Sequence, residues 1–162
     1  MCALSRENFD KKYNLYSQEL MNISYGYTKN KDDSFDIIQK VFYKLFNSNK
    51  SFKTPNDEKY WLIRITINES KDFFRQKKKI EILDEKAIDS LSYNEEENKD
   101  IRLHMLAKLV KELPDEYRAV IILHYYDSLA IKDISKILKI SENAVKKRLE
   151  RARNMLKIQM EV

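Results

Sequence analysis

The residues best suited to contact a charged partner form a row near the carboxyl end of this 162-residue chain. The row consists of polar and cationic side chains: Ser141, Asn143, Lys146, Lys147, Arg148, Arg151 and Arg153. Arg and Lys donate hydrogen bonds to guanine edges and to phosphates, and Asn pairs with the edge of adenine. Five cations against the single anion Glu150 predict a face that contacts DNA. An ordinary helical hairpin whose charged face is only solvated is the alternative.

Two helices and a corner must position this row. Apolar residues at three- and four-residue intervals predict the first helix: Ile131, Ile134, Ile137 and Leu138. The same spacing predicts the second: Val145, Leu149, Ala152, Met155 and Leu156. Ser141 supplies an N-cap for the second helix, and Lys139 occupies the corner position that Gly usually fills. We therefore predict a helix-turn-helix with a positive φ at Lys139.

A family resemblance begins in this segment. Residues 133–156 have the pattern Asp-Ile-Ser-x-x-Leu-x-Ile-Ser-x-x-Ala-Val-Lys-x-Arg-Leu-x-Arg-Ala-Arg-x-x-Leu. This pattern resembles the region 4 helix-turn-helix of bacterial extracytoplasmic-function sigma factors, which are small members of the sigma-70 family. Residues 113–123, with the pattern Leu-Pro-x-x-Tyr-Arg-x-Val-Ile-x-Leu, match the start of the same region. The resemblance implies that the cationic row recognises the −35 promoter element.

A second set of candidate residues lies on a long helix predicted for residues 60–79, after a loop at residues 47–56. Its polar side offers Asn68, Lys71, Asp72 and Arg75, and its apolar face includes Trp61, Ile65 and Phe73, with Leu62 alongside. Trp-Leu-x-x-Ile-x-x-Asn-x-x-x-Asp-x-x-Arg resembles regions 2.3 and 2.4 of the family. There the helix and the preceding loop bind the non-template strand of the −10 element, and a flipped base needs a small polar pocket.

Two structural alternatives stand beside this −10 interpretation. Lysines at a helix carboxyl end, such as those at 77–79, are favourable through the helix dipole alone. Trp61 is better explained as a core residue than as a platform on which a base stacks.

A third set lies on the helix predicted for residues 33–46, with N-cap candidates Asp32 and Asp33. The residues with a predicted binding role are Asp36, Gln39 and Lys40. The segment from Asp36 to Phe42 resembles the region 2.2 motif, whose helix docks on the clamp helices of the RNA polymerase core. Phe35 departs from the Glu that the family usually has there. A plain amphipathic helix accounts for the periodicity equally well.

Composition and charge predict the architecture. One Gly and two Pro are too few for sheets with tight turns, so the chain should be all-α. The net charge is +6 over residues 1–80, −6 over 81–100 and +5 over 101–162. We predict two small helical domains, a region 2-like bundle at 6–80 and a region 4-like helix-turn-helix domain at 101–160, joined by an acidic linker at 81–100.

Several classes of function find no support in the sequence. It has no phosphate-binding Gly-rich loop and no nucleophile–base constellation, and His104 and His124 lie too far apart to form a metal-ligand cluster. We expect no enzyme activity, cofactor, metal ion or small-molecule substrate, and His124 should be a packed residue. The sequence contains no run of about 20 apolar residues, so nothing in it predicts membrane insertion. The single cysteine, Cys2, excludes an internal disulfide and fits the cytoplasm.

The partners implied by the resemblance are the RNA polymerase core and promoter DNA, and an anti-sigma factor is left open. The function implied is a sigma factor that brings the polymerase core to promoters and assists initiation. Two alternatives are a helix-turn-helix regulator that does not engage polymerase and a sigma mimic that forms no productive holoenzyme. An enzyme with an unfamiliar active site ranks below both.

Overall fold

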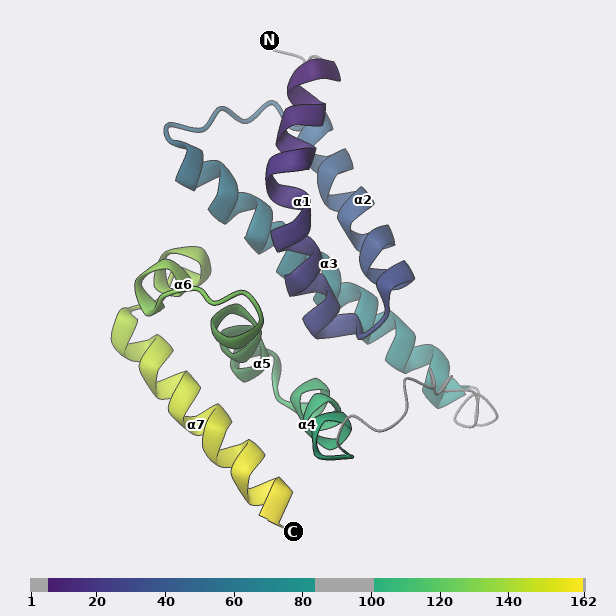
Figure 1. Ribbon diagram of the computed structural model, residues 1–162, viewed down its shortest axis with the longest axis vertical. Coiled ribbons are helices and arrows are strands. Elements are labelled where there is room, and N and C mark those ends of the chain that lie inside the picture. Colours follow the sequence, from purple (N-terminus) through teal and green to yellow (C-terminus); the bar gives the residue numbers. More distant parts are fainter. Residues whose placement is uncertain (1–5, 84–100, 162) are drawn as a thin grey trace.

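The computed structural model describes residues 6–83 and 101–161, and all regular elements in these ranges are helical (Figure 1). The first module contains α1 (Arg6–Thr28), α2 (Lys31–Asn47) and α3 (Pro55–Leu83). The second module contains α4 (Ile101–Glu112), α5 (Asp115–Ile121), the π-helical turn η2 (Ile122–Tyr126), α6 (Ile131–Leu138) and α7 (Glu142–Glu161). The predicted all-α class is confirmed. Residues 84–100, most of the predicted linker, lie outside the described residues.

The core of the first module lies where α1, α2 and α3 pack against one another. The sequence of α1 has apolar residues at intervals of three and four, and among them Leu20, Ile23 and Tyr27 are buried almost completely. From α2, the buried residues are Ile37, Ile38, Val41, Phe42 and Leu45. Each large apolar side chain removed from water stabilises the fold by about 1.5–3 kcal/mol, so this shared core fixes the direction of α3.

The start of α2 differs from the sequence prediction. Asn30, and neither Asp32 nor Asp33, is the N-cap, because its extended backbone lets its side-chain oxygen accept a hydrogen bond from the amide of Asp33 over 3.0 Å. Asp32 and Asp33 lie in the first turn, where their charges complement the helix dipole. The polar side of α2 lies in solvent because the opposite side packs in the core.

Both ends of α3 extend beyond the predicted helix. The helix begins at Pro55, whose fixed φ suits the first position of a helix, so residues 55–56 do not belong to the loop. The hydroxyl of Thr54 accepts from the amide of Asp57 over 3.2 Å. The helix ends at Leu83, so residues 81–83 of the predicted linker are helical.

The buried face of α3 is also rotated from the predicted one. Leu62, Ile63 and Ile67 are at most 2% exposed, whereas Trp61, Ile65 and Phe73 are only half-buried. The true face continues through small polar residues, Thr66 and Ser70, which carry no hydrophobic signal. The hydroxyl of Thr66 is satisfied by the carbonyl of Leu62 within the same helix, over 2.8 Å.

The helix-turn-helix of the second module forms as predicted. Lys139 adopts φ 57° and ψ 44°, which ends α6, and its amide bonds to the carbonyl of Ser135. The hydroxyl of Ser141 then accepts from the amide of Ala144 over 3.1 Å and caps α7. The buried faces meet through Ile134 and Ile137 of α6 and several residues of α7: Val145, Leu149, Ala152 and Leu156.

The two modules pack against each other, α1 against η2 and α3 against α6 (Figure 1). The only glycine of the chain, Gly26, lies at this interface, where an added Cβ would be 2.9 Å from Cγ2 of Ile122. That distance is shorter than carbon atoms tolerate, so glycine allows α1 to approach η2 this closely.

Candidate nucleic-acid interface

Helix α7 lies on the side of the second module that faces away from α1–α3 (Figure 1). Six of the seven predicted contact residues are exposed on this helix or at its cap: Ser141, Asn143, Lys146, Lys147, Arg151 and Arg153. Arg148 is half-buried, and its guanidinium lies 3.9 Å from the carboxylate of Glu116. Arg153 donates to the hydroxyl of Tyr125 over 2.6 Å, and Ser141 is engaged in the cap. The structure therefore collects all seven predicted residues at one helix, with its first two turns open to solvent.

On α3, three of the four predicted residues are exposed: Asn68, Asp72 and Arg75. Arg75 lies 3.9 Å from Asp72 and donates to Asp115 of α5 over 2.5 Å. Lys71 is half-buried, and this burial lowers the pKa of its ammonium despite the nearby Asp115. The four residues thus lie along one helix, and part of this set already contacts the second module.

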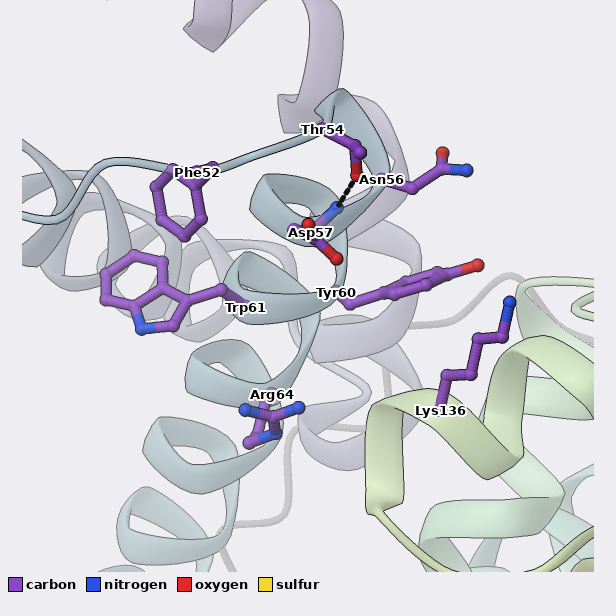
Figure 2. A pocket seen from close by; sticks show the side chains of 8 residues that line it. All are labelled: Phe52, Thr54, Asn56, Asp57, Tyr60, Trp61, Arg64 and Lys136. Atoms are coloured by element: carbon purple, nitrogen blue, oxygen red, sulfur yellow. Dashed lines mark hydrogen bonds between the residues drawn. The ribbon is translucent and has the colours of Figure 1, made fainter.

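An open cavity of about 480 Å³ lies at the beginning of α3 (Figure 2). The residues that line it combine aromatic, polar and charged side chains: Phe52, Thr54, Asn56, Asp57, Tyr60, Trp61, Arg64 and Lys136. All but Lys136 come from the loop before α3 or from the first turns of α3 itself. Lys136 extends from α6 and forms the opposite wall, so the cavity lies between the two modules.

The side chains of the cavity are held by specific contacts. The rings of Phe52 and Trp61 lie 5.7 Å apart at 56°, and the ammonium of Lys50 lies 5.5 Å from the indole centroid. Arg64 donates through Nε to the carbonyl of Ile137 over 2.9 Å. Tyr60 donates to Oδ1 of Asp133 over 2.7 Å, and this hydrogen bond is the main reason that the pKa of Tyr60 is raised to about 12.

This lining can hold a flat, polar heterocycle. Aromatic faces stack on any base, and the amide of Asn56, the carboxylate of Asp57 and the guanidinium of Arg64 can hydrogen-bond to its edge. Trp61 is half-buried: it packs against the hydrophobic core, as expected, and it also lines the cavity.

Most of this cavity was missed from sequence. The loop at residues 47–56 and the helix at residues 60–79 were assigned to the −10 strand, but no cavity between them was predicted, although the aromatic residues Phe52, Tyr60 and Trp61 around the polar Asn56 could have signalled a stacking site. The contribution of Lys136, on a distant helix, had no local signal.

The exposed side of α2 carries Asp36, Gln39 and Lys40, all in solvent. Large apolar side chains are exposed on the same helix, with Phe35 at 45% and Tyr43 at 70%. Mixed polar and aromatic surfaces of this kind suit contact with another protein. Phe35, which departs from the family pattern, is therefore part of the exposed surface.

A second, mostly apolar groove of about 400 Å³ lies in the second module. Its lining comes from α4, α5, η2 and α7: Leu106, Val110, Ile121, Tyr125, Tyr126, Arg153 and Leu156. This groove was not predicted from the sequence, because its residues belong to four elements whose individual apolar faces look like core.

Within the described residues, no cluster of His, Cys, Asp and Glu side chains could hold a metal ion. His124 is half-buried and its Nδ1 lies 3.1 Å from the carbonyl of Leu129, as expected for a packed residue. Among the same residues, no helix has the length and apolar character needed to span a membrane.

Comparison with known proteins matches both modules to family models. The model described as Sigma-70 region 2 matches residues 13–80, and Sigma-70, region 4 matches residues 103–156. RNA polymerase sigma factor SigV of Bacillus subtilis (strain 168) is 34% identical over 146 residues, which are 90% of this chain and 86% of that protein. ECF RNA polymerase sigma factor SigM of the same organism is 30% identical over 151 residues, 91% of this chain and 92% of that protein.

A solved structure also has the same fold. The sigma factor RpoE from Bartonella quintana, in complex with the anti-sigma factor NepR, matches with a TM-score of 0.68 at 22% identity. The match covers 96% of this chain and 98% of that chain.

Proposed function

The chain belongs to the sigma-70 family, in its extracytoplasmic-function group, and we propose that its two modules divide promoter recognition between them. It is a sigma factor that directs RNA polymerase to promoters, and its partners are the polymerase core and promoter DNA. The proposed domains are 6–80 and 101–160, joined by residues 81–100. The first three residues of that linker continue α3.

We assign −35 recognition to α7. Its capped amino-terminal turns expose Asn143, Lys146 and Lys147, which lie where a recognition helix contacts base edges. Arg148, Arg151 and Arg153 follow and contact phosphates, which position the helix and supply affinity that does not depend on sequence.

We assign −10 recognition to α3 and the loop before it. The observation that carries this assignment is the cavity at the start of α3, which is large enough for one unpaired base and lined by rings and hydrogen-bonding groups. Asn68, Lys71, Asp72 and Arg75 continue along the same helix, so a strand whose base enters the cavity has polar and cationic partners further along α3.

The remaining surfaces suit protein partners. The exposed side of α2, with Asp36, Gln39 and Lys40, docks on the polymerase core. The apolar groove of the second module fits the apolar face of an amphipathic helix, and we propose an anti-sigma factor as a further partner because the similar RpoE structure is a complex with one. Sigma factors are non-catalytic initiation factors, and this chain acts in the cytoplasm without chemistry or a cofactor of its own.

Run-off transcription with purified polymerase core tests the function. A working factor gives transcripts only from promoters with both elements intact, and scrambling either element abolishes them. A sigma mimic would bind the polymerase core but give no transcripts. A helix-turn-helix regulator that does not engage polymerase would bind duplex promoter DNA equally well with and without the core. Either result would replace the proposal.

A further inference from the structure

The cavity at the start of α3 combines aromatic rings with cations that have no acidic partner. Arg64 lines it from α3, and Lys136 forms the opposite wall from α6 (Figure 2). A third cation, Lys50, lies 5.5 Å from the centroid of Trp61. Among the described residues, none of these three cations has a carboxylate oxygen within 4.0 Å. The cavity therefore has cationic groups available to an anionic ligand.

We propose that this cavity binds a free purine nucleotide, with the base against Phe52 and Trp61 and the phosphates between Arg64 and Lys136. The ligand is a small molecule, and its site takes one wall from each module. The inference therefore goes beyond promoter recognition and does not depend on the −10 role of α3. The cavity volume of about 480 Å³ lies within the range of about 300–1,000 Å³ that is typical of small-molecule sites.

The aromatic end of the cavity suits a purine base. The rings of Phe52 and Trp61 lie 5.7 Å apart and are tilted by 56°, so a flat ligand can stack on one ring and contact the edge of the other. A purine has two fused rings and removes more apolar area from water than a pyrimidine does. Asn56 and Asp57 are exposed beside these rings, where the amide can donate and accept and the carboxylate can accept from an exocyclic amino group.

The cationic end of the cavity suits phosphate groups. Arg64 donates through Nε to the carbonyl of Ile137 over 2.9 Å, and its two terminal nitrogens have no hydrogen-bond partner within the described residues. A guanidinium held in this way can donate two parallel hydrogen bonds to one phosphate. Lys136 adds a second charge with three N–H donors from the opposite wall. A phosphate between them would accept charge-assisted hydrogen bonds from both modules.

Two hydrogen bonds hold the walls of the cavity in place. Tyr60 of α3 donates to Asp133 over 2.7 Å, and Arg64 of the same helix donates to the carbonyl of Ile137. Asp133 and Ile137 lie on either side of Lys136 in the sequence of α6, so these contacts fix the part of α6 that carries Lys136. A site whose walls are already positioned loses less conformational freedom when the ligand binds.

The only tryptophan of the chain, Trp61, lines the cavity and reports directly on its occupancy. The full chain would be titrated with ADP and with GDP while tryptophan fluorescence is recorded, and N-acetyltryptophanamide would correct for light absorbed by the nucleotide. We expect saturable quenching by both nucleotides, with adenosine binding at least about tenfold more weakly than ADP because it lacks the phosphates. Absence of saturable quenching by ADP and GDP would overturn the proposal, as would equal binding of adenosine and ADP.

Lys136→Ala tests the wall that the second module provides. Lys136 is exposed, so its replacement leaves the core intact, and we expect ADP to bind at least about fivefold more weakly. The matched control is Lys132→Ala, which removes the same charge one turn earlier on α6, outside the cavity lining. It should change ADP binding by less than about twofold, because an exposed charge outside the site is screened by salt. Equal losses in the two variants would show that net charge alone attracts the nucleotide and would overturn the site.

A mixed-sequence single-stranded DNA oligonucleotide separates this inference from the proposed −10 role. We expect the strand and the nucleotides each to quench Trp61, because each brings a base to the same rings. Quenching by the strand with none by ADP or GDP would overturn the nucleotide site and leave the −10 assignment in place. Quenching by ADP and GDP with none by the strand would support the nucleotide site and count against the −10 assignment of the cavity.

Discussion

The hydroxyl of Tyr60 in α3 donates a hydrogen bond to Oδ1 of Asp133 in α6 over 2.7 Å, although the two residues are 73 positions apart in sequence. One partner lines the proposed base cavity and the other precedes the recognition helix. This single hydrogen bond therefore couples the surface proposed for the −10 element to the module proposed for the −35 element.

Tyr60 offers a spectroscopic measure of that coupling. Its pKa is raised to about 12, chiefly by the hydrogen bond to Asp133, because ionised phenol would lose its donated proton and face the carboxylate. Asp133→Ala should bring the pKa down toward the usual tyrosine value of about 10. Titration of ¹³C-tyrosine resonances, with Tyr60→Phe for assignment, would measure it. A pKa unchanged by Asp133→Ala would contradict the hydrogen bond.

Asp115 should restrain the DNA-binding surface of α3. Asp115→Asn removes the charge that pairs with Arg75, so we expect single-stranded DNA to bind about 2–5-fold more tightly, in keeping with the small free energy of an exposed ion pair. Fluorescence anisotropy at fixed salt would measure the change.

The matched control for this substitution is Asp10→Asn, which removes the same charge from an exposed site on α1, away from the proposed DNA-binding surfaces. It should alter DNA binding only through net charge. If both variants bind single-stranded DNA more tightly by the same factor, Asp115 acts only through the net charge of the chain and not through its ion pair with Arg75.

The packing of the two modules against each other should depend on pH through Asp127. Its carboxyl faces Glu19 of α1 and Lys59 of α3, and burial, followed by the contact with Glu19, raises its pKa to about 8. In the separated state it should ionise near the usual value of about 4. Between these two pKa values, separation of the modules releases up to about one proton per molecule. Raising the pH therefore favours separation. Burial lowers the pKa of Lys29 to about 8, above most of this window, so Lys29 is mostly charged there and adds only a smaller slope of the opposite sign.

Small-angle scattering of the full chain between about pH 5 and 7.5 would detect the shift as a larger radius of gyration at the higher pH. Asp127→Asn cannot ionise, and its radius should not depend on pH in this range. The same pH dependence in Asp127→Asn and in the natural chain would assign the effect to another group.

Local features of this fold were predictable, because their causes are local. The cap at Ser141, the positive φ of Lys139 and the buried stripe of α1 depend on residues within a turn or two. The cap at Asn30 was missed because neighbouring aspartates compete for the same role in sequence.

Features that depend on distant residues were not predictable. The core face of α3 includes Thr66 and Ser70, which look polar until α1 and α2 cover them. Arg118 looks like a surface cation in sequence, but its buried guanidinium lies against the rings of Tyr27 and Phe74. It also donates to the carbonyl of Leu113 over 2.7 Å and lies 3.2 Å from the carboxylate of Asp115. The cavity at α3 needs Lys136 from another helix, so its full lining follows only from the tertiary arrangement.

The exposed side of α2 should serve polymerase binding and not folding. Asp36 and Gln39 are both in solvent, opposite the buried Ile38 and Val41. Replacing both with Ala should weaken core affinity by more than about 1 kcal/mol while leaving the thermal melt almost unchanged. Asp10→Ala, exposed on α1, is the control for charge. A large drop in melting temperature with intact core binding would assign the pair to stability.

The assignment of the −35 and −10 elements to different modules gives the most specific prediction. Lys146 lies in the exposed early turns of α7, where a base contact is worth about 1–3 kcal/mol, whereas Arg151 lies further along and should contact phosphate. Lys146→Ala should therefore relax preference at one position of the −35 element. Arg151→Ala should weaken all sequences alike and reduce the salt dependence, because one fewer counterion is released.

The same experiment separates α3 from α7. Asn68 and Arg75 lie on α3, so Asn68→Ala and Arg75→Ala should spare −35 preference and impair selection or opening of the −10 element. Footprinting and run-off transcription with reconstituted holoenzyme, on promoters varied at one element at a time, measure both effects in the same reactions. Because Arg75 also pairs with Asp115, its replacement should ease module separation, so Asn68→Ala is the cleaner test of strand binding. A −35 preference changed by Asn68→Ala, or a −10 preference alone changed by Lys146→Ala, would reverse the assignment of the two modules.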